Sequence, residues 1–73
     1  MPSDALHRHI AARIREHARR RKISLNKLAD FAGISRSQLG RVLRCEQAPT
    51  TVTLAKLAAA LNVNTRDLLP PTG

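Results

Sequence analysis

The stretch that decides the fold is Ile23-Ser-Leu-Asn-Lys-Leu-Ala-Asp-Phe-Ala-Gly-Ile-Ser-Arg-Ser-Gln-Leu-Gly-Arg-Val-Leu-Arg44. It holds two segments with helical apolar spacing, 25–32 and 36–44, and each follows a serine that can cap a helix. Gly33 lies between them, where a glycine can adopt the left-handed conformation that ends a helix. We therefore expect two short helices that are joined by a tight turn and meet at a steep angle.

Helical spacing continues on both sides of this stretch. Upstream, the apolar stripe consists of Leu6, Ile10, Ile14 and Ala18, which predicts a helix over 4–21. Downstream, leucine spacing predicts a helix over 51–61 after Thr50, and a short helix over 65–69 that stops before Pro70. No strand-like alternation occurs in the sequence. The sequence thus predicts an all-α fold of five helices in a single domain over residues 1–73.

The charge of the chain is strongly basic and unevenly distributed. Among 73 residues, 13 are Lys or Arg and 5 are Asp or Glu, which gives a formal net charge of +8. The basic residues concentrate before Cys45, and the remainder of the chain is close to neutral. Such an asymmetry indicates a polyanionic partner such as nucleic acid, although the basic run 19–22 can also be a solvated helix end.

The outward face of the predicted helix over 36–44 is basic. Arg36, Ser37 and Arg41 can donate hydrogen bonds to the edges of bases, and Arg44 adds charge that attracts phosphates. Gly40 weakens its own helix, which suggests a close approach to the backbone at that point. This face is typical of a helix that enters a groove of a nucleic acid.

These residues resemble the Cro/phage-repressor (Xre-like) helix-turn-helix family from about Ile10 to Leu69. The matching positions are Ile14-Arg15, Ile23-Ser24, Leu28-Ala29, Gly33-Ile34-Ser35, Pro49-Thr50, Leu54, Leu57-Ala58, Leu61 and Val63. The resemblance implies a compact five-helix, lambda-repressor-like domain, with the helix-turn-helix formed by its second and third helices. It also implies a sequence-specific DNA-binding transcriptional regulator, a repressor-like homodimer on a pseudo-palindromic operator of double-stranded DNA.

The resemblance further implies roles for individual residues. The implied base-reading residues are Arg36, Ser37, Gln38 and Arg41. The implied phosphate-binding residues are Ser24, Lys27, Ser35, Arg44 and Thr50. Arginine in the groove favours guanine, because two of its donors match O6 and N7 of that base.

Three departures from the family pattern affect these expectations. Leu25 stands where many members have a phosphate-binding glutamine, and Cys45 stands where many have glycine. Ala18 and Leu43 stand where members often have an Arg–Glu ion pair. Replacing both partners of a buried ion pair by apolar residues is often neutral or stabilising. We therefore expect Ala18 and Leu43 to be neighbours.

The sequence lacks the patterns that most other classes of function require. Cys45 is the only cysteine, and no Ser/His/Asp or Cys/His arrangement has local support, so we expect neither an enzyme nor a cofactor. His7, His9 and His17 do not share a helix face at metal-binding spacing, so we expect no metal. No apolar run is long enough to span a membrane and no signal peptide is evident, which favours the cytoplasm.

Alternatives remain within and outside the family. An antitoxin or a restriction-modification controller that regulates its own synthesis would have the same fold. A protein-interaction adaptor, or a binder of anionic membrane surfaces through the basic first helix, would belong to another class. The candidate dimer surface lies in the neutral last third and consists of Leu61, Val63, Leu68 and Leu69.

Overall fold

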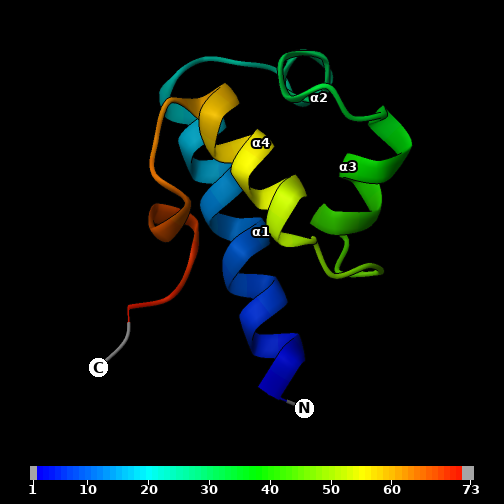
Figure 1. Ribbon diagram of the computed structural model, residues 1–73, viewed down its shortest axis with the longest axis vertical. Coiled ribbons are helices and arrows are strands. Elements are labelled where there is room, and N and C mark those ends of the chain that lie inside the picture. Colours follow the sequence, from blue (N-terminus) through cyan, green and yellow to red (C-terminus); the bar gives the residue numbers. More distant parts are fainter. Residues whose placement is uncertain (1, 72–73) are drawn as a thin grey trace.

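Four α-helices and one short 3-10 helix form the part of the chain that the structure describes (Figure 1). The computed structural model describes the backbone of residues 2–71 and the side chains of residues 5–71. The elements are α1 (Pro2–Arg20), α2 (Leu25–Ala32), α3 (Arg36–Leu43), α4 (Thr51–Leu61) and η1 (Thr65–Leu68). No residue in this range lies in a strand, so the all-helical prediction is confirmed.

The prediction of five α-helices is wrong in its last element. Residues 65–68 form a single 3-10 turn, because the segment is too short for a ladder of α-helical bonds and Pro70 follows at once. Asn64 begins this turn, and its backbone N–H donates to the Asp67 carboxylate over 2.9 Å. The other helix boundaries differ from the expected ones by at most two residues, α1 starting at Pro2 and α3 ending at Leu43.

The helices pack around one core of aliphatic side chains. The buried apolar residues are Ile10, Ala11, Ile14, Ala18, Leu28, Ala29, Ala32, Leu39, Val42, Leu43, Leu54, Leu57, Ala58, Leu61 and Leu68. Leu6, which belongs to the predicted apolar stripe of α1, is 39% exposed, and Leu25 is 36% exposed. Both lie near the start of a helix. Phe31 is 62% exposed, so the core is built without an aromatic ring.

All four α-helices end with the same hydrogen-bond pattern, the Schellman motif. The residues that take the left-handed conformation are Lys22, Gly33, Cys45 and Asn62, with φ between 57° and 71°. In each case the next N–H bonds back five residues, as from Ile23 to the carbonyl of Ala18 over 2.9 Å. After three of the helices this next residue is apolar and packs against the core: Ile23, Ile34 and Val63. The packing of these three residues against the core therefore helps to determine where α1, α2 and α4 end.

Lys22 allows the cost in free energy of a non-glycine residue in the left-handed conformation after a helix to be measured. It is exposed and has φ of 57°, a conformation that costs a residue with a Cβ about 1 kcal/mol or more. We expect Lys22→Gly to raise the free energy of unfolding in urea by about 1 kcal/mol. Lys22→Ala removes the same charge but keeps the Cβ, so it should give no such gain. Equal effects of the two variants would show that the backbone conformation is not the cause.

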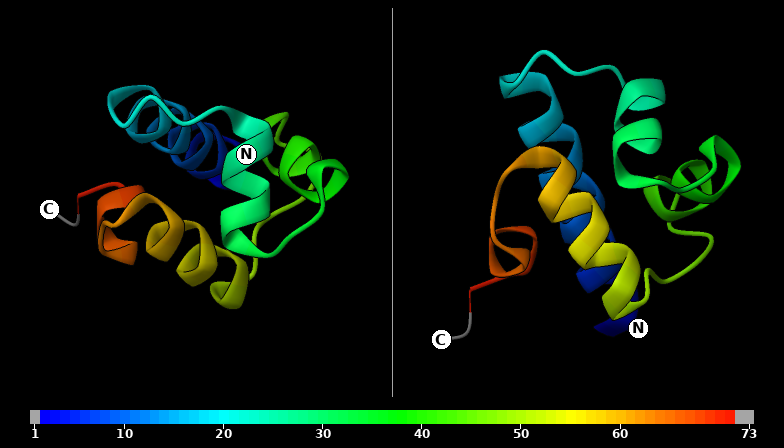
Figure 2. Two further views of the ribbon diagram at one scale, coloured as in Figure 1. Left: turned by 90° about the horizontal axis from the view of Figure 1, so that it is seen from above. Right: turned by 45° about the horizontal axis from the view of Figure 1, so that its top comes forward.

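The arrangement leaves α3 at one side of the molecule. α1 and α4 lie side by side at the centre, α2 packs on α4, and α3 packs on α1 and α2. Figures 1 and 2 show α3 and η1 on opposite sides of this centre. The outward face of α3 is therefore open to solvent and to a partner.

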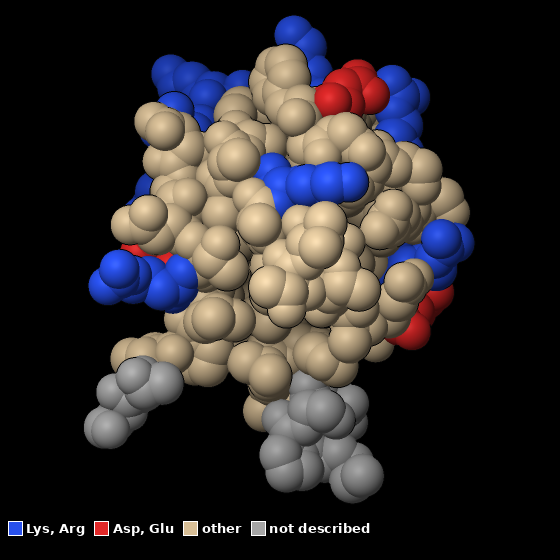
Figure 3. Space-filling view, in the orientation of Figure 1, with Lys and Arg blue, Asp and Glu red and all other residues tan. Residues whose placement is uncertain are grey.

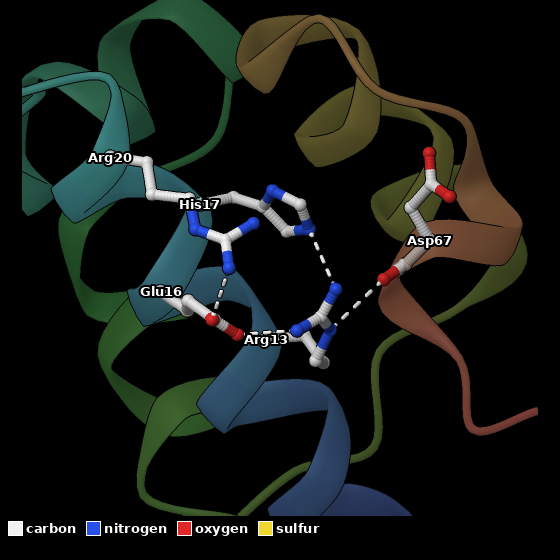
Figure 4. Close-up of polar contacts among 5 residues, drawn as sticks. All are labelled: Arg13, Glu16, His17, Arg20 and Asp67. Carbon is white, nitrogen blue, oxygen red and sulfur yellow. Dashed lines mark hydrogen bonds and ion pairs between the residues drawn. The ribbon is translucent and has the colours of Figure 1, made fainter.

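Arg13 ties α1 to η1 on the side away from α3. Its Nε donates to the backbone carbonyl of Asp67 over 3.3 Å, and its guanidinium also contacts Glu16 and His17 (Figure 4). Glu16 accepts a second hydrogen bond from Arg20 over 2.7 Å. Exposed ion pairs of this kind contribute little stability each. The bond to a backbone carbonyl joins η1 to α1, and the fully buried Leu68 packs η1 against the core.

Candidate nucleic-acid interface

Local chemistry determines how α3 presents its basic face. Ser35 caps the helix, because its hydroxyl oxygen accepts the backbone N–H of Gln38 over 2.9 Å. Leu39, Val42 and Leu43 are buried and fix the inner face of the helix. The opposite face therefore carries the predicted residues Arg36, Ser37, Arg41 and Arg44, which are all exposed. The structure thus brings these four residues together on one open surface.

Arg41 is the most constrained of the predicted base-reading side chains. Its Nη1 donates to the hydroxyl oxygen of Ser37 over 3.0 Å, one helical turn earlier. Its Nε donates to the side-chain oxygen of Gln47 over 3.1 Å. Gln47 lies in the loop after α3 and was not among the residues predicted from the sequence. The two residues are six positions apart across a loop, and no sequence pattern indicates a contact at that separation. Arg41 thus makes hydrogen bonds to two neutral partners, one on α3 and one in the loop that follows.

Arg36 is held much more loosely. Its Nη2 lies 4.0 Å from the carboxylate of Asp30 on α2, and both side chains are 65% exposed. An exposed pair at this distance contributes little, so Arg36 can leave it at small cost. The sequence did not predict this contact between Asp30 and Arg36.

Gln38 faces α4 instead of the solvent-exposed surface of α3. Its side-chain amide donates to the hydroxyl oxygen of Thr53 over 3.4 Å. Thr53 is only 6% exposed, and its hydroxyl oxygen also accepts from the hydroxyl of Thr50 over 3.0 Å. Thr50 in turn caps α4 by accepting the backbone N–H of Thr53. Since a buried hydroxyl needs partners, Gln38 links α3 to α4 in this arrangement.

Arg44 lies flat along α3 and is paired with an acid. A Cβ built on Gly40 would lie 2.9 Å from Nη1 of Arg44, so the glycine makes room for this side chain. The close approach expected at Gly40 is therefore made by the helix's own arginine. Nε of Arg44 donates to the Glu46 carboxylate over 2.6 Å. This hydrogen bond, and then the charge of Arg44, hold the pKa of the Glu46 carboxyl below its ordinary value, so the pair persists at neutral pH and is lost only in acid.

Ser24 lies at the start of α2 beside two arginines of α1. Its hydroxyl oxygen accepts the backbone N–H of Lys27 over 3.1 Å, and the earlier N–H groups of α2 are left without partners inside the helix. A shallow groove of about 360 Å³ runs along this position, and its lining includes Arg15 and Arg19. These two side chains place positive charge beside the apolar Leu25. Their convergence on Ser24 depends on the packing of α1 against α2.

The face over α4 is less charged than the outward face of α3. Figure 3 shows that the face over α4 is mostly without charge, whereas Lys and Arg side chains gather around its rim. Of the four residues expected to form a dimer surface, Leu61 and Leu68 are fully buried, because the core uses them, and that part of the expectation is wrong. Leu69 is 37% exposed and Val63 is half-buried against the core.

The remaining features of the described part of the chain concern metal sites, membrane-spanning helices and other grooves. Within it, no group of three or more His, Cys, Asp or Glu residues lies close enough to hold a metal ion. None of the described helices combines the length and the apolar character that crossing a membrane requires. A groove of about 560 Å³ lies between α1 and the segment after η1, and its lining includes His9, Arg13 and Arg66.

Comparison with known proteins places this geometry in a family. Residues 13–68 match the family model HTH_3, described as helix-turn-helix. The HTH-type transcriptional regulator SutR of Escherichia coli (strain K12) is 35% identical over 66 residues. That match covers 90% of this chain but only 37% of SutR, so the chain spans little more than a third of the length of this relative.

Two solved structures are similar over most of this chain. The restriction-modification controller protein C.AhdI from Aeromonas hydrophila has a TM-score of 0.82 and 32% identity, and the match covers 86% of this chain and 96% of C.AhdI. SinR, the master regulator for biofilm formation, was solved in complex with DNA; it has a TM-score of 0.75 and 33% identity, and the match covers 81% of this chain and 95% of that one. The chain thus belongs to the helix-turn-helix family HTH_3, the Xre-like family of DNA-binding transcriptional regulators.

Proposed function

We propose that this chain is a sequence-specific DNA-binding transcriptional regulator that inserts α3 into the major groove. The observation that carries the proposal is the outward face of α3, where Arg36, Ser37 and Arg41 are exposed together on a helix fixed by its buried inner face. An α-helix fits the major groove, and arginine there favours guanine. In this proposal Arg36, Ser37 and Arg41 read bases, and Gln38, whose side chain bonds to Thr53 of α4, is the weaker candidate among the four predicted residues.

The phosphate contacts surround α3 on both sides. Ser24, Lys27 and Ser35 lie at or near the starts of α2 and α3, where free N–H groups and the helix dipole attract anions. Arg44 and Thr50 lie beyond the end of α3 and at the start of α4. To this predicted set we add Arg15 and Arg19, because they line the groove beside Ser24. Together these residues would fix the register of α3 on the duplex without reading sequence.

We propose that the DNA-binding species is a homodimer on a pseudo-palindromic operator. One recognition helix contacts few base pairs, and two copies one helical turn apart, about 34 Å, would double the contacts. The exposed part of the neutral C-terminal surface, around Val63 and Leu69, is available for such a contact. In this reading residues 1–73 act as one domain in the cytoplasm. A controller that regulates its own synthesis is the second candidate, favoured by the match to nearly the whole of C.AhdI.

Selection of bound fragments from random DNA, at a stated salt concentration, tests the proposal. We expect one enriched motif that contains guanine and shows two-fold symmetry, and an affinity that falls steeply as salt rises. Steep salt dependence without an enriched motif would leave only non-specific binding. Without DNA binding, affinity for a protein that barely responds to salt would favour the adaptor, and affinity for anionic vesicles would favour the membrane binder.

Release of Arg44 from its ion pair should strengthen binding to every DNA sequence alike. Glu46→Gln removes the carboxylate that holds Arg44 at 2.6 Å and frees the guanidinium for a phosphate. We expect a uniform gain in affinity and a salt dependence steeper by about one counterion. Glu16→Gln changes the net charge equally but lies on α1, so it is the matched control. Equal gains from both variants would attribute the effect to net charge alone.

A further inference from the structure

We propose that Gln47 determines the specificity of DNA reading by orienting Arg41, so that Arg41 grips a guanine end-on through Nη1 and Nη2. The inference rests on the proposed function, because it assumes that Arg41 enters the groove. It goes further in assigning a role to a loop residue that contacts no base, and in specifying which edge of the guanidinium faces the base.

The hydrogen bonds of Arg41 leave one of its two forked edges open. A guanidinium has five N–H groups, of which Nε carries one and each Nη carries two. The single N–H of Nε is taken by the side-chain oxygen of Gln47 at 3.1 Å. The fork formed by Nε and Nη2 is therefore closed to a base. Ser37 takes one N–H of Nη1, and the groups that remain belong to Nη1 and Nη2.

The end of α3 explains why Gln47 reaches Arg41 at all. Cys45 takes the left-handed conformation, with φ of 62°, and the chain reverses its direction there. The backbone N–H of Glu46 then bonds back to the carbonyl of Arg41 over 2.8 Å. The loop is thus anchored to the same residue whose side chain Gln47 holds. Backbone and side chain of Arg41 are both fixed by the loop that follows the helix.

Holding Arg41 in place matters because an arginine side chain is otherwise free to rotate. A free side chain can exchange a guanine for a phosphate or for another acceptor nearby, whereas a fixed fork matches one base edge. Both hydrogen-bond partners of Arg41 are neutral, so these bonds orient the guanidinium without cancelling its charge, and the nearby Glu46 acts on Arg41 only through space. This distinguishes Arg41 from Arg44, whose partner Glu46 is an acid.

The test is a cycle of variants at positions 41 and 47, measured on the selected operator and on operators with each base changed. Gln47→Met keeps the length of the side chain but removes the acceptor oxygen. We expect it to lower the preference for guanine at the position read by Arg41 by about tenfold, while affinity for random DNA stays the same. In an Arg41→Ala background, Gln47→Met should change no base preference, because there is no guanidinium left to orient.

A conservative rescue separates positioning from simple packing. Gln47→Glu restores an oxygen acceptor but adds a negative charge, so we expect weaker binding to all DNA together with a retained preference for guanine. The inference is overturned if Arg41→Ala abolishes a guanine preference that Gln47→Met leaves intact, or if Gln47→Met acts equally with and without Arg41. If instead the native chain shows no base preference, the proposed function itself fails, and this result is distinct from the other two.

Discussion

Replacing Arg41 by alanine is expected to weaken binding to the selected operator by about 1–3 kcal/mol per half-site, or roughly 5- to 150-fold, and to relax the preference at one base position. The physical reason is that a bidentate arginine discriminates guanine from the other bases, whereas alanine has no donor to offer. Competition binding against operators changed at each position measures both quantities. Arg41 is exposed and makes no buried contact, so the variant should fold normally.

Arg20→Ala is the control for this variant. Arg20 is exposed at the end of α1, where its contact is an ion pair with Glu16. Its loss removes the same charge and should weaken all sequences alike, with no change in preference. If Arg41→Ala behaved in the same way, Arg41 would be a phosphate contact. If neither Arg36→Ala nor Arg41→Ala altered any base preference, the assignment of α3 as the reading element would be wrong.

The largest effect on stability is expected at Leu43. This residue is 7% exposed within the core, so Leu43→Glu would bury an unpaired carboxylate at a cost of several kcal/mol. A domain of this size has a total stability of about 5 kcal/mol, so the variant should be largely unfolded. Helical circular dichroism and urea titration would show it.

Addition of Ala18→Arg should restore much of this loss. Ala18 is 2% exposed in the same core, and Arg15, one turn before it, donates to the backbone carbonyl of Leu43 over 3.4 Å. Because the sequence predicts that Ala18 and Leu43 are neighbours, an arginine at position 18 would pair with the new carboxylate. Ala18→Arg should not rescue Leu39→Glu, which places the same charge at another buried position of α3. Equal rescue of both variants would contradict the predicted contact.

The predictable part of the fold depends on local signals. Ser24, Ser35 and Thr50 were each expected to start a helix, and each accepts the backbone N–H three residues later. The end of α2 at Gly33 was equally predictable, since glycine takes the left-handed conformation without strain. By contrast, the left-handed residues that follow α1 and α3 are Lys22 and Cys45, whose side chains give no such signal. In α1 the stop is favoured by the packing of Ile23, which lies further along the chain.

The candidate site divides in the same way. Helical spacing alone placed Arg36, Ser37 and Arg41 on one exposed face. This face lies opposite the buried residues of α3, which are Leu39, Val42 and Leu43. Spacing could not show which of these arginines is held and which is loose. That depends on Gln47 and Asp30, residues on a loop and on another helix.

The stretch from Ile23 to Arg44 by itself determined two capped helices, the turn between them and the direction of the basic face, since each of these follows from contacts within a few residues. Only the tertiary structure decided that Gln38 turns toward α4, that Leu61 and Leu68 belong to the core and not to a dimer surface, and that a loop residue orients Arg41. The reason is that burial and side-chain orientation depend on neighbours that are distant along the chain. Local spacing carries no information about them.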